Sequence, residues 1–232
     1  MKVAAIVPAG GVGKRLGTKM LKPFVRVCGK TLLAHTLIRL TRTFSFREII
    51  IPTIPSRVKA VKRLCQSHGI KDAKVVDGGA TRSESVWNAL KEVTSACDWV
   101  LIHDAARPLI SRDMVTRLLK EAKKSGAALC GIPVTSTVKR LDGKKKTVVF
   151  TEDRAFLYLA QTPQVFKRDW LLKRFKTLGK KAFQATDDSG LFDGTPIRVS
   201  VVEGAAGNLK ITTPADLEWL EYYLKKKKKA VK

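Results

Sequence analysis

Residues 3–17 read Val-Ala-Ala-Ile-Val-Pro-Ala-Gly-Gly-Val-Gly-Lys-Arg-Leu-Gly, a short apolar run that passes into a glycine-rich loop. A nearly all-apolar run such as Lys2–Pro8 is typical of a strand buried on both faces of a parallel sheet. In an open α/β sheet, ligands bind beyond the carboxyl ends of the strands, which is where these glycines stand. The stretch therefore predicts an α/β fold with a binding loop directly after its first strand.

Cations stand inside and just after this loop, at Lys14, Arg15, Lys19 and Lys22. The spacing is not that of a P-loop, because no Ser or Thr follows the lysine, and it is not the dinucleotide fingerprint, because Leu16 stands where the third glycine belongs. Backbone N–H groups and cations together suit a triphosphate, whose charge must be neutralised as pyrophosphate leaves. We expect the loop to bind such a group.

Apolar runs alternate with helical periodicity along most of the chain. Strands are expected at Glu48–Pro52, Ala73–Val76, Trp99–His103, Ala127–Pro133 and Ile197–Val202. Helices are expected at Leu32–Thr41, Ser56–His68, Ser83–Val93, Ser111–Ser125 and Asp169–Leu178, with a helical turn at Asp187–Phe192 and a last helix from Thr213-Pro214. This alternation predicts a Rossmann-like, mostly parallel, doubly wound sheet.

One segment breaks the alternation. Asp142-Gly143, a strong turn signal, separates Thr135–Leu141 from Thr147–Asp153. We expect a protruding β-hairpin arm over residues 135–154, able to pair with another subunit. Since no internal repeat or long linker is visible, we expect one domain over residues 1–232, with a basic, frayed tail at 225–232.

The net charge of +25 predicts anionic partners, because 45 basic residues stand against 20 acidic ones. A nucleic-acid-binding module is one alternative, but the sequence lacks a helix-turn-helix, an RNP-like aromatic motif and zinc-ligand spacing, and only 7% of its residues are aromatic. We expect no specific nucleic-acid partner. No apolar stretch is long enough for a bilayer and no secretory signal is visible, so we expect a cytoplasmic protein without a membrane partner.

A second polar motif, His103-Asp104-Ala105-Ala106-Arg107-Pro108, follows the strand at Trp99–Ile102. An aspartate at the carboxyl end of a strand can take part in holding Mg²⁺, and a nearby arginine can bind phosphate. An Asp-x-x-Arg pair by itself is commonly a surface ion pair. Its place at the same sheet edge as the glycine loop favours a site, with His103 as a packing residue.

Five motifs in order give a resemblance to a known family. They are Pro8–Arg15, Leu21–Phe24, His103–Pro108, Gln161-Thr162-Pro163-Gln164 and Asn208–Thr212. The first two resemble sugar-phosphate nucleotidyltransferases in general. All five, from about residue 3 to residue 224, resemble the 2-C-methyl-D-erythritol 4-phosphate cytidylyltransferase family of the non-mevalonate isoprenoid pathway.

The resemblance implies roles for particular residues. Arg15 and Lys22 match the pair that neutralises the triphosphate and stabilises the transition state, and Arg154 and Lys210 match further catalytic cations. The implied nucleotide contacts are Ala9, Gly10, Gly11, Gly13, Lys14, Gly78, Gly79, Ser85, Asp104 and Ala105. The implied acceptor contacts are Asp104, Arg107, Thr137, Arg154, Thr162 and Lys210.

The implied reaction is in-line attack of a polyol phosphate on the α-phosphorus of CTP, without a general base because the attacking phosphate is already ionised. The resemblance implies Mg²⁺ or another divalent cation, held mainly by the CTP phosphates with Asp104 as the nearest protein candidate. It also implies a homodimer in which the arm brings Thr137 and Arg154 to the neighbour's site.

Some positions depart from the family pattern. Ala80-Thr81 stand where acidic residues often follow Gly78-Gly79, Gly207 precedes Asn208 where an aspartate is frequent, and Asp187-Asp188 replaces a common Asp-Glu pair. We expect the two aspartates either to be structural or to support residues that contact the ligand. Ribitol-5-phosphate cytidylyltransferase is the rival within enzymes, since it shares the glycine loop and the Thr-Pro-Gln segment.

Overall fold

The computed structural model describes residues 1–11, 13, 16–17, 20–71 and 73–229 of the chain. Its centre is a seven-stranded sheet in the order β11-β7-β10-β6-β1-β4-β5. The strands are β1 (Val3–Ile6), β4 (Glu48–Thr53), β5 (Ala73–Asp77), β6 (Trp99–Ile102), β7 (Ala127–Pro133), β10 (Tyr158–Lys167) and β11 (Ser200–Glu203). All adjacent pairs are parallel except those of β10, which runs antiparallel to β6 and β7. The predicted mostly parallel sheet is confirmed.

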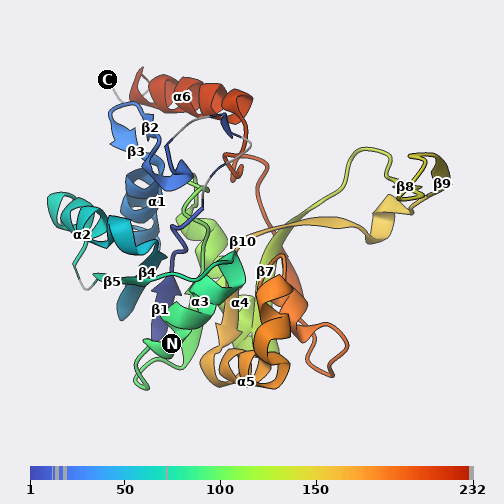
Figure 1. Ribbon diagram of the computed structural model, residues 1–232, viewed down its shortest axis with the longest axis horizontal. Helices are drawn as coiled ribbons and strands as arrows, with labels where there is room; N and C mark the ends of the chain where they lie inside the picture. The colour runs from blue at the N-terminus through green and yellow to red at the C-terminus, as the bar shows by residue number, and fades with distance from the viewer. Residues whose placement is uncertain (12, 14–15, 18–19, 72, 230–232) are drawn as a thin grey trace.

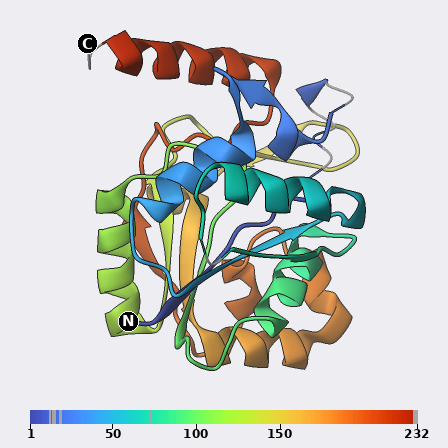
Figure 2. The same cartoon turned by 90° about the vertical axis from the view of Figure 1, so that its left-hand side faces the viewer.

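Helices cover both faces of the sheet, as the alternation predicts. Residues of β1 alternate between two buried cores: Val3 and Ala5 belong to one, Ala4 and Ile6 to the other. The first core is closed by α1 (Leu32–Thr41), α2 (Val58–Ser67) and α4 (Arg112–Ser125). The second is closed by α3 (Arg82–Lys91) and α5 (Arg168–Leu178), and Figure 2 shows α4 on the opposite side of the sheet from these two.

Local sequence explains where several helices begin. Ser111 and Thr81 precede α4 and α3, and their hydroxyl groups accept hydrogen bonds from the backbone N–H groups of Met114 and Glu84 at 3.2 and 3.1 Å. Such caps satisfy N–H groups that have no partner within the helix. The last helix, α6 (Pro214–Lys229), has proline at its first position and continues through the first five lysines of the tail, where a frayed end was expected.

Smaller elements complete the chain. The short pair β2 (Arg26–Val27) and β3 (Lys30–Thr31) lies beside α6, and 3₁₀ turns occupy Lys22–Phe24, Pro55–Arg57, Arg154–Phe156, Gly179–Gln184 and Ser189–Phe192. The predicted hairpin is present as β8 (Lys139–Leu141) and β9 (Val148–Thr151), and it extends away from the body (Figure 1). Its turn is closed by Asp142, whose carboxylate accepts a hydrogen bond from the Thr147 hydroxyl at 2.7 Å.

The sequence reasoning missed β10, which lies between β6 and β7. Its register shifts between Gln161 and Gln164 because Pro163 has no N–H to donate to the ladder. The shift turns polar groups of this strand toward the loop that follows β6. Among the described residues, no helix is long and apolar enough to cross a membrane.

Candidate active site

A cavity of about 360 Å³ opens where the loops after β1, β5 and β6 meet at the carboxyl edge of the sheet. Its lining combines glycines, small side chains and cations: Pro8, Gly10, Gly11, Gly13, Lys22, Pro23, Gly79, Ala80, Thr81, Arg82, Ser85, Asp104, Ala105, Ala106, Lys210 and Thr212. The volume is in the range of small-molecule sites. The glycine motif that follows β1 and the His103–Pro108 motif that follows β6 therefore contribute to one site.

The first glycine loop is folded against Lys22. Gly13 has a φ of +69°, and a Cβ at this position would stand 2.8 Å from the Cβ of Lys22. The backbone N–H of Lys22 donates to the Gly11 carbonyl at 3.2 Å. Only glycine at position 13 allows this approach, so the loop fixes the origin of the lysine side chain at the cavity wall.

The second glycine pair caps the start of α3. A Cβ on Gly79 would lie 2.2 Å from the Cγ of Glu84, and the Glu84 carboxylate accepts a hydrogen bond from the Ala80 N–H at 2.6 Å. The Ser85 hydroxyl accepts from the Gly79 N–H at 3.0 Å and donates to the Thr81 carbonyl at 2.9 Å. This tight turn leaves a narrow wall made of backbone and small side chains.

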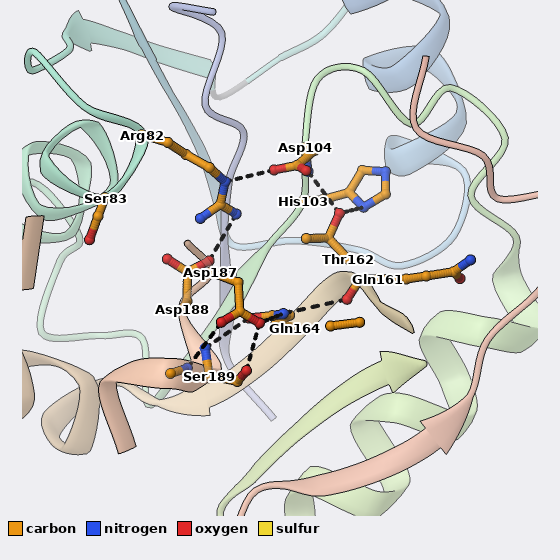
Figure 3. Close-up of polar contacts among 12 residues, drawn as sticks. Arg82, Ser83, His103, Asp104, Gln161, Thr162, Gln164, Asp187, Asp188 and Ser189 are labelled. Atoms are coloured by element: carbon orange, nitrogen blue, oxygen red, sulfur yellow. Dashed lines mark hydrogen bonds and ion pairs between the residues drawn. The ribbon is translucent and has the colours of Figure 1, made fainter. Parts of the chain in front are cut away.

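Asp104 contacts two cations, Arg82 and Lys210, and Figure 3 shows its contact with Arg82. Arg82 Nε donates to its Oδ1 at 2.9 Å, and Lys210 Nζ lies 2.6 Å from its Oδ2. Burial alone would raise the pKa of Asp104, but Arg82 and Lys210 outweigh it and hold the pKa well below the ordinary value. The carboxylate is therefore ionised at neutral pH, and it fixes Lys210, which is half-exposed, at the mouth of the cavity.

Arg82 also faces Asp188, which lies on the far side of its guanidinium (Figure 3). Arg82 Nη2 stands 2.9 Å from Asp188 Oδ2, although the two groups lack the alignment of a hydrogen bond. Burial raises the pKa of Asp188, and Arg82 opposes that shift. Among the described residues Arg82 Nη1 has no hydrogen-bond partner; this atom is buried, although Arg82 is among the residues that line the cavity.

A chain of hydrogen bonds holds the loop after β6 in place. The backbone N–H of Asp104 donates to the Thr162 hydroxyl at 3.0 Å. The same hydroxyl lies 3.1 Å from His103 Nδ1. The other ring nitrogen, His103 Nε2, lies 2.9 Å from the Arg107 carbonyl oxygen. Burial lowers the pKa of His103 to about 4, so the ring is neutral. A carbonyl accepts only, so Nε2 carries the proton and Nδ1 accepts from Thr162. His103 thus has the packing role expected from the sequence.

The structure does not bring Arg107 to the cavity wall. Its side chain is buried, and its Nη1 and Nη2 donate to the carbonyls of Asn208 and Ala160 at 2.7 and 3.4 Å. Burial lowers the pKa of the guanidinium, and Asp104 partly restores it. In this arrangement Arg107 joins β10 to the segment that carries Lys210, and contact with an acceptor phosphate stays a prediction.

The predicted site residues other than Arg107 fall into four groups. Gly10, Gly11, Gly13, Lys22, Gly79, Ser85, Asp104, Ala105 and Lys210 line the cavity together. Ala9, Gly78 and Thr162 are not among the described residues that line the cavity, and Thr137 and Arg154 are exposed on the arm and its base. Lys14 and Arg15 lie outside the described residues.

Arg82 is the residue that sequence reasoning missed. It follows Thr81, the N-cap of α3, and a charged residue there reads as solvated surface. Asp187, by contrast, is structural as expected, since it accepts hydrogen bonds from Gln164 Nε2 at 2.8 Å and Ser189 Oγ at 2.6 Å. Within the described ranges no group of three or more His, Cys, Asp or Glu side chains could hold a metal ion.

Comparisons with known proteins show the family of this chain. The family model described as 2-C-methyl-D-erythritol 4-phosphate cytidylyltransferase matches residues 3–226. A protein of that name from Clostridium botulinum (strain Loch Maree / Type A3) is 35% identical over 226 residues, covering 97% of this chain and 98% of the relative. The bifunctional enzyme IspD/IspF of Desulfotalea psychrophila is 36% identical, and the chain spans only 57% of that longer protein.

A solved structure shows the same fold. The 2-C-methyl-D-erythritol 4-phosphate cytidylyltransferase of Thermus thermophilus superposes with a TM-score of 0.79 at 32% identity, over 97% of this chain and 100% of the other. Motif order, sheet topology and the family match over nearly the whole chain lead to one conclusion. The chain belongs to the 2-C-methyl-D-erythritol 4-phosphate cytidylyltransferase family.

Proposed function

We propose that this chain transfers CMP from CTP to 2-C-methyl-D-erythritol 4-phosphate and releases pyrophosphate. The observation that carries the proposal is the convergence of Lys22, Arg82 and Lys210 with two glycine turns around one cavity. A triphosphate needs that combination of cations and backbone N–H groups. The acceptor is the one in the family's name. Ribitol 5-phosphate is the alternative acceptor, and the experiment below distinguishes the two.

The chemistry is a displacement at phosphorus. An oxygen of the acceptor phosphate forms a bond to the α-phosphorus of CTP, the bond from that phosphorus to the bridging oxygen breaks, and pyrophosphate leaves with the electron pair. The attacking oxygen carries a negative charge at neutral pH, so no base takes a proton. The protein's contribution is to align the two phosphates and to neutralise the charge that grows on the leaving group.

We assign this charge neutralisation to Lys22 together with Arg15, which the resemblance implies. Lys22 packs against Gly13 of the first glycine loop. Lys210 lines the same cavity and pairs with Asp104. This placement suits one cation for the leaving pyrophosphate and another for the acceptor phosphate. Arg82 lines the same cavity and adds a third cation to it.

The residues present fit a divalent cation held mainly by the substrate. Mg²⁺ commonly binds through one or two carboxylates together with substrate phosphates. Among the described residues that line the cavity, Asp104 is the one carboxylate, and it already faces two cations. Mg²⁺ would supply further charge neutralisation on the triphosphate, with Asp104 as the nearest protein group.

We also propose that the arm forms a homodimer. Leu141, Val148, Val149, Phe150, Phe156, Tyr158 and Leu159 are exposed on the arm and its base, and Phe156 is 84% exposed. A monomer rarely exposes so many large apolar side chains together. Pairing of two arms would cover them and carry Thr137 and Arg154 to the neighbour's cavity.

The deciding experiment incubates the purified chain with CTP, Mg²⁺ and either acceptor, with mass detection of the cytidine diphosphate ester and a separate pyrophosphate assay. We expect equimolar product and pyrophosphate with 2-C-methyl-D-erythritol 4-phosphate. ATP, GTP and UTP serve as nucleotide controls, and Lys22→Ala controls for a contaminating enzyme. Preference for ribitol 5-phosphate would reassign the acceptor, and failure to form product with either acceptor would refute the proposal.

A further inference from the structure

A second cavity, larger than the active-site cavity, lies between α1 and α6, which Figure 2 shows one above the other. Its volume is about 700 Å³. Five cations line it: Lys30, Arg39, Arg42, Arg112 and Lys227. We call it the α1–α6 cavity. The two cavities have no lining residue in common in the described part of the chain.

None of these five cations forms an ion pair with a carboxylate among the described residues. Other surface cations do so: Arg117 pairs with Asp113, and Lys225 pairs with Glu221. Like charges that gather in a concave site without counter-charges repel each other and raise the local concentration of anions. The α1–α6 cavity therefore has a strong positive potential.

Helix electrostatics explain three of the five cations, one of which is Lys227 in the last turn of α6. Arg39 and Arg42 stand at the carboxyl end of α1, where cations are favourable. Arg112 occupies the first position of α4, where a cation is unfavourable, and its Nη2 reaches back to the Arg42 carbonyl at 2.9 Å. Lys30 and Lys227 belong to β3 and α6, so three separate segments join α1 in placing charge at this cavity.

Among the described residues that line this cavity, none is an aspartate or glutamate that would supply a negative charge. Burial lowers the pKa of Arg39, Tyr223 raises it and Arg42 lowers it again. His35 lines the same cavity, and its Nε2 lies 2.8 Å from the Val27 carbonyl oxygen. Burial lowers the pKa of His35, and the positive charges of Lys30 and Arg39 lower it further. The imidazole is therefore neutral at pH 7, and the charge of the site comes from the five lysines and arginines.

We propose that the α1–α6 cavity is a binding site for a small polyanion carrying two or more phosphate groups, separate from the catalytic site. Three arginines favour phosphate because the planar guanidinium matches two phosphate oxygens at once. A cavity of this size accepts a small molecule and excludes a folded macromolecule. The proposal does not depend on the assigned reaction, since none of the five cations lines the active-site cavity.

The reactivity of a cysteine in the cavity wall can report on binding at this site. Cys28 lines the cavity and is half-buried, whereas Cys65, Cys97 and Cys130 are buried in the body. A neutral thiol reagent such as N-ethylmaleimide should alkylate Cys28 first, and a bound anion should slow that reaction. Mass spectrometry of the four cysteine peptides measures the rates, and reaction of the buried three would reveal unfolding.

The probe is inorganic tripolyphosphate, added to the full chain at moderate ionic strength. We expect saturable protection of Cys28 in the wild type and in Lys22→Ala, because the active site is not involved. In Arg39→Gln/Arg112→Gln the midpoint of protection should rise roughly 10²-fold, since removing each charge-assisted hydrogen bond should weaken binding about tenfold. Lys62→Gln/Arg63→Gln on α2 removes the same net charge at exposed positions and should leave the midpoint unchanged.

A second variant guards against misfolding of the first. Lys30→Gln/Lys227→Gln changes two exposed side chains and should weaken protection similarly. Absence of protection in the wild type, or equal protection in the cavity and control variants, would overturn the proposal. Protection by anionic lipid vesicles or by a single-stranded oligonucleotide, without protection by tripolyphosphate, would overturn it as well and assign the surface to that partner.

Discussion

The guanidinium of Arg82 donates to the carboxylate of Asp104 at 2.9 Å and so joins the first turn of α3 to the loop that follows β6. The same carboxylate holds Lys210 from the opposite side, at 2.6 Å. Two cations from distant segments are thus positioned by one buried acid. Arg82 therefore positions Lys210 through the carboxylate that they share.

Replacement of Arg82 by Gln should lower kcat/KM for the acceptor by roughly 10²-fold, because one partner of a buried charge pair is lost. It should also lower the free energy of unfolding by about 3–5 kcal/mol, since Asp188 is left buried without its cation. Steady-state kinetics and urea unfolding measure the two effects. Arg63→Gln, at an exposed position on α2, is the matched control.

The double variant Arg82→Gln/Asp188→Asn separates these two roles. Removing the unpaired acid should restore much of the stability and leave kcat/KM low. Recovery of both quantities together would show that Arg82 acts through folding alone.

Loss of the Lys22 ammonium should reduce turnover far more than binding. We expect Lys22→Ala to lower kcat by roughly 10²–10³-fold, because a preorganised charge is missing where the leaving group develops. The dissociation constant for CTP, measured by calorimetry without acceptor, should change much less. Near-normal turnover in this variant would remove Lys22 from the mechanism.

A methyl group on Gly79 should disturb nucleotide binding. The added Cβ would stand 2.2 Å from Glu84 Cγ, so the Glu84 carboxylate would lose its place at the Ala80 N–H. We expect Gly79→Ala to raise KM for CTP by roughly tenfold, the order of one hydrogen bond to a charged group. Gly207→Ala is the control, since no heavy atom lies within 4 Å of its added Cβ, and an equal effect in both variants would contradict the explanation.

Protonation of His103 should make stability depend on pH. Its folded pKa, about 4, lies below the ordinary value of 6.5, so the unfolded chain binds the proton first as pH falls. The stabilisation is complete above about pH 6.5 and is lost as pH falls toward 4, which amounts to about 2 kcal/mol between pH 7 and pH 5.

The test measures the free energy of unfolding of the wild type and of His103→Gln at both pH values. The difference between the two pH values should be smaller by about that amount in the variant, whatever its stability at pH 7. His68→Gln, at an exposed position, controls for the loss of an imidazole as such. Equal pH dependence in wild type and His103→Gln would contradict the assignment.

The sequence predicted what local patterns determine. The run Val3–Ile6 and the N-cap Ser111 lie where periodicity and capping rules place them, because those rules act over a few residues. β10 escaped prediction because buried Gln161, Thr162 and Gln164 beside a proline do not resemble a central strand. Arg82 escaped because its partner Asp188 is more than a hundred residues away, and no local rule connects them.

The last prediction concerns the arm. If Arg154 works in the neighbour's site, Arg154→Ala and Lys22→Ala should each be nearly inactive, and their mixture should regain activity. In a mixed dimer one cavity has an intact Lys22 and receives an intact Arg154 from the other subunit. Random reassociation makes about half of the dimers mixed, each with one intact site, so the mixture should reach roughly a quarter of wild-type activity.

Activity must be followed after dissociation and reassociation of the two variants, with mixed dimers confirmed by distinct affinity tags. Lys144→Ala, at the exposed end of the hairpin, removes a cation from the same arm and should retain wild-type activity alone. A mixture that stays as inactive as its components, although mixed dimers are present, would show that Arg154 serves its own subunit or none. The Arg154 guanidinium donates a hydrogen bond to the Thr135 carbonyl at the base of the arm. Such a result would therefore give Arg154 the structural role of fixing the hairpin.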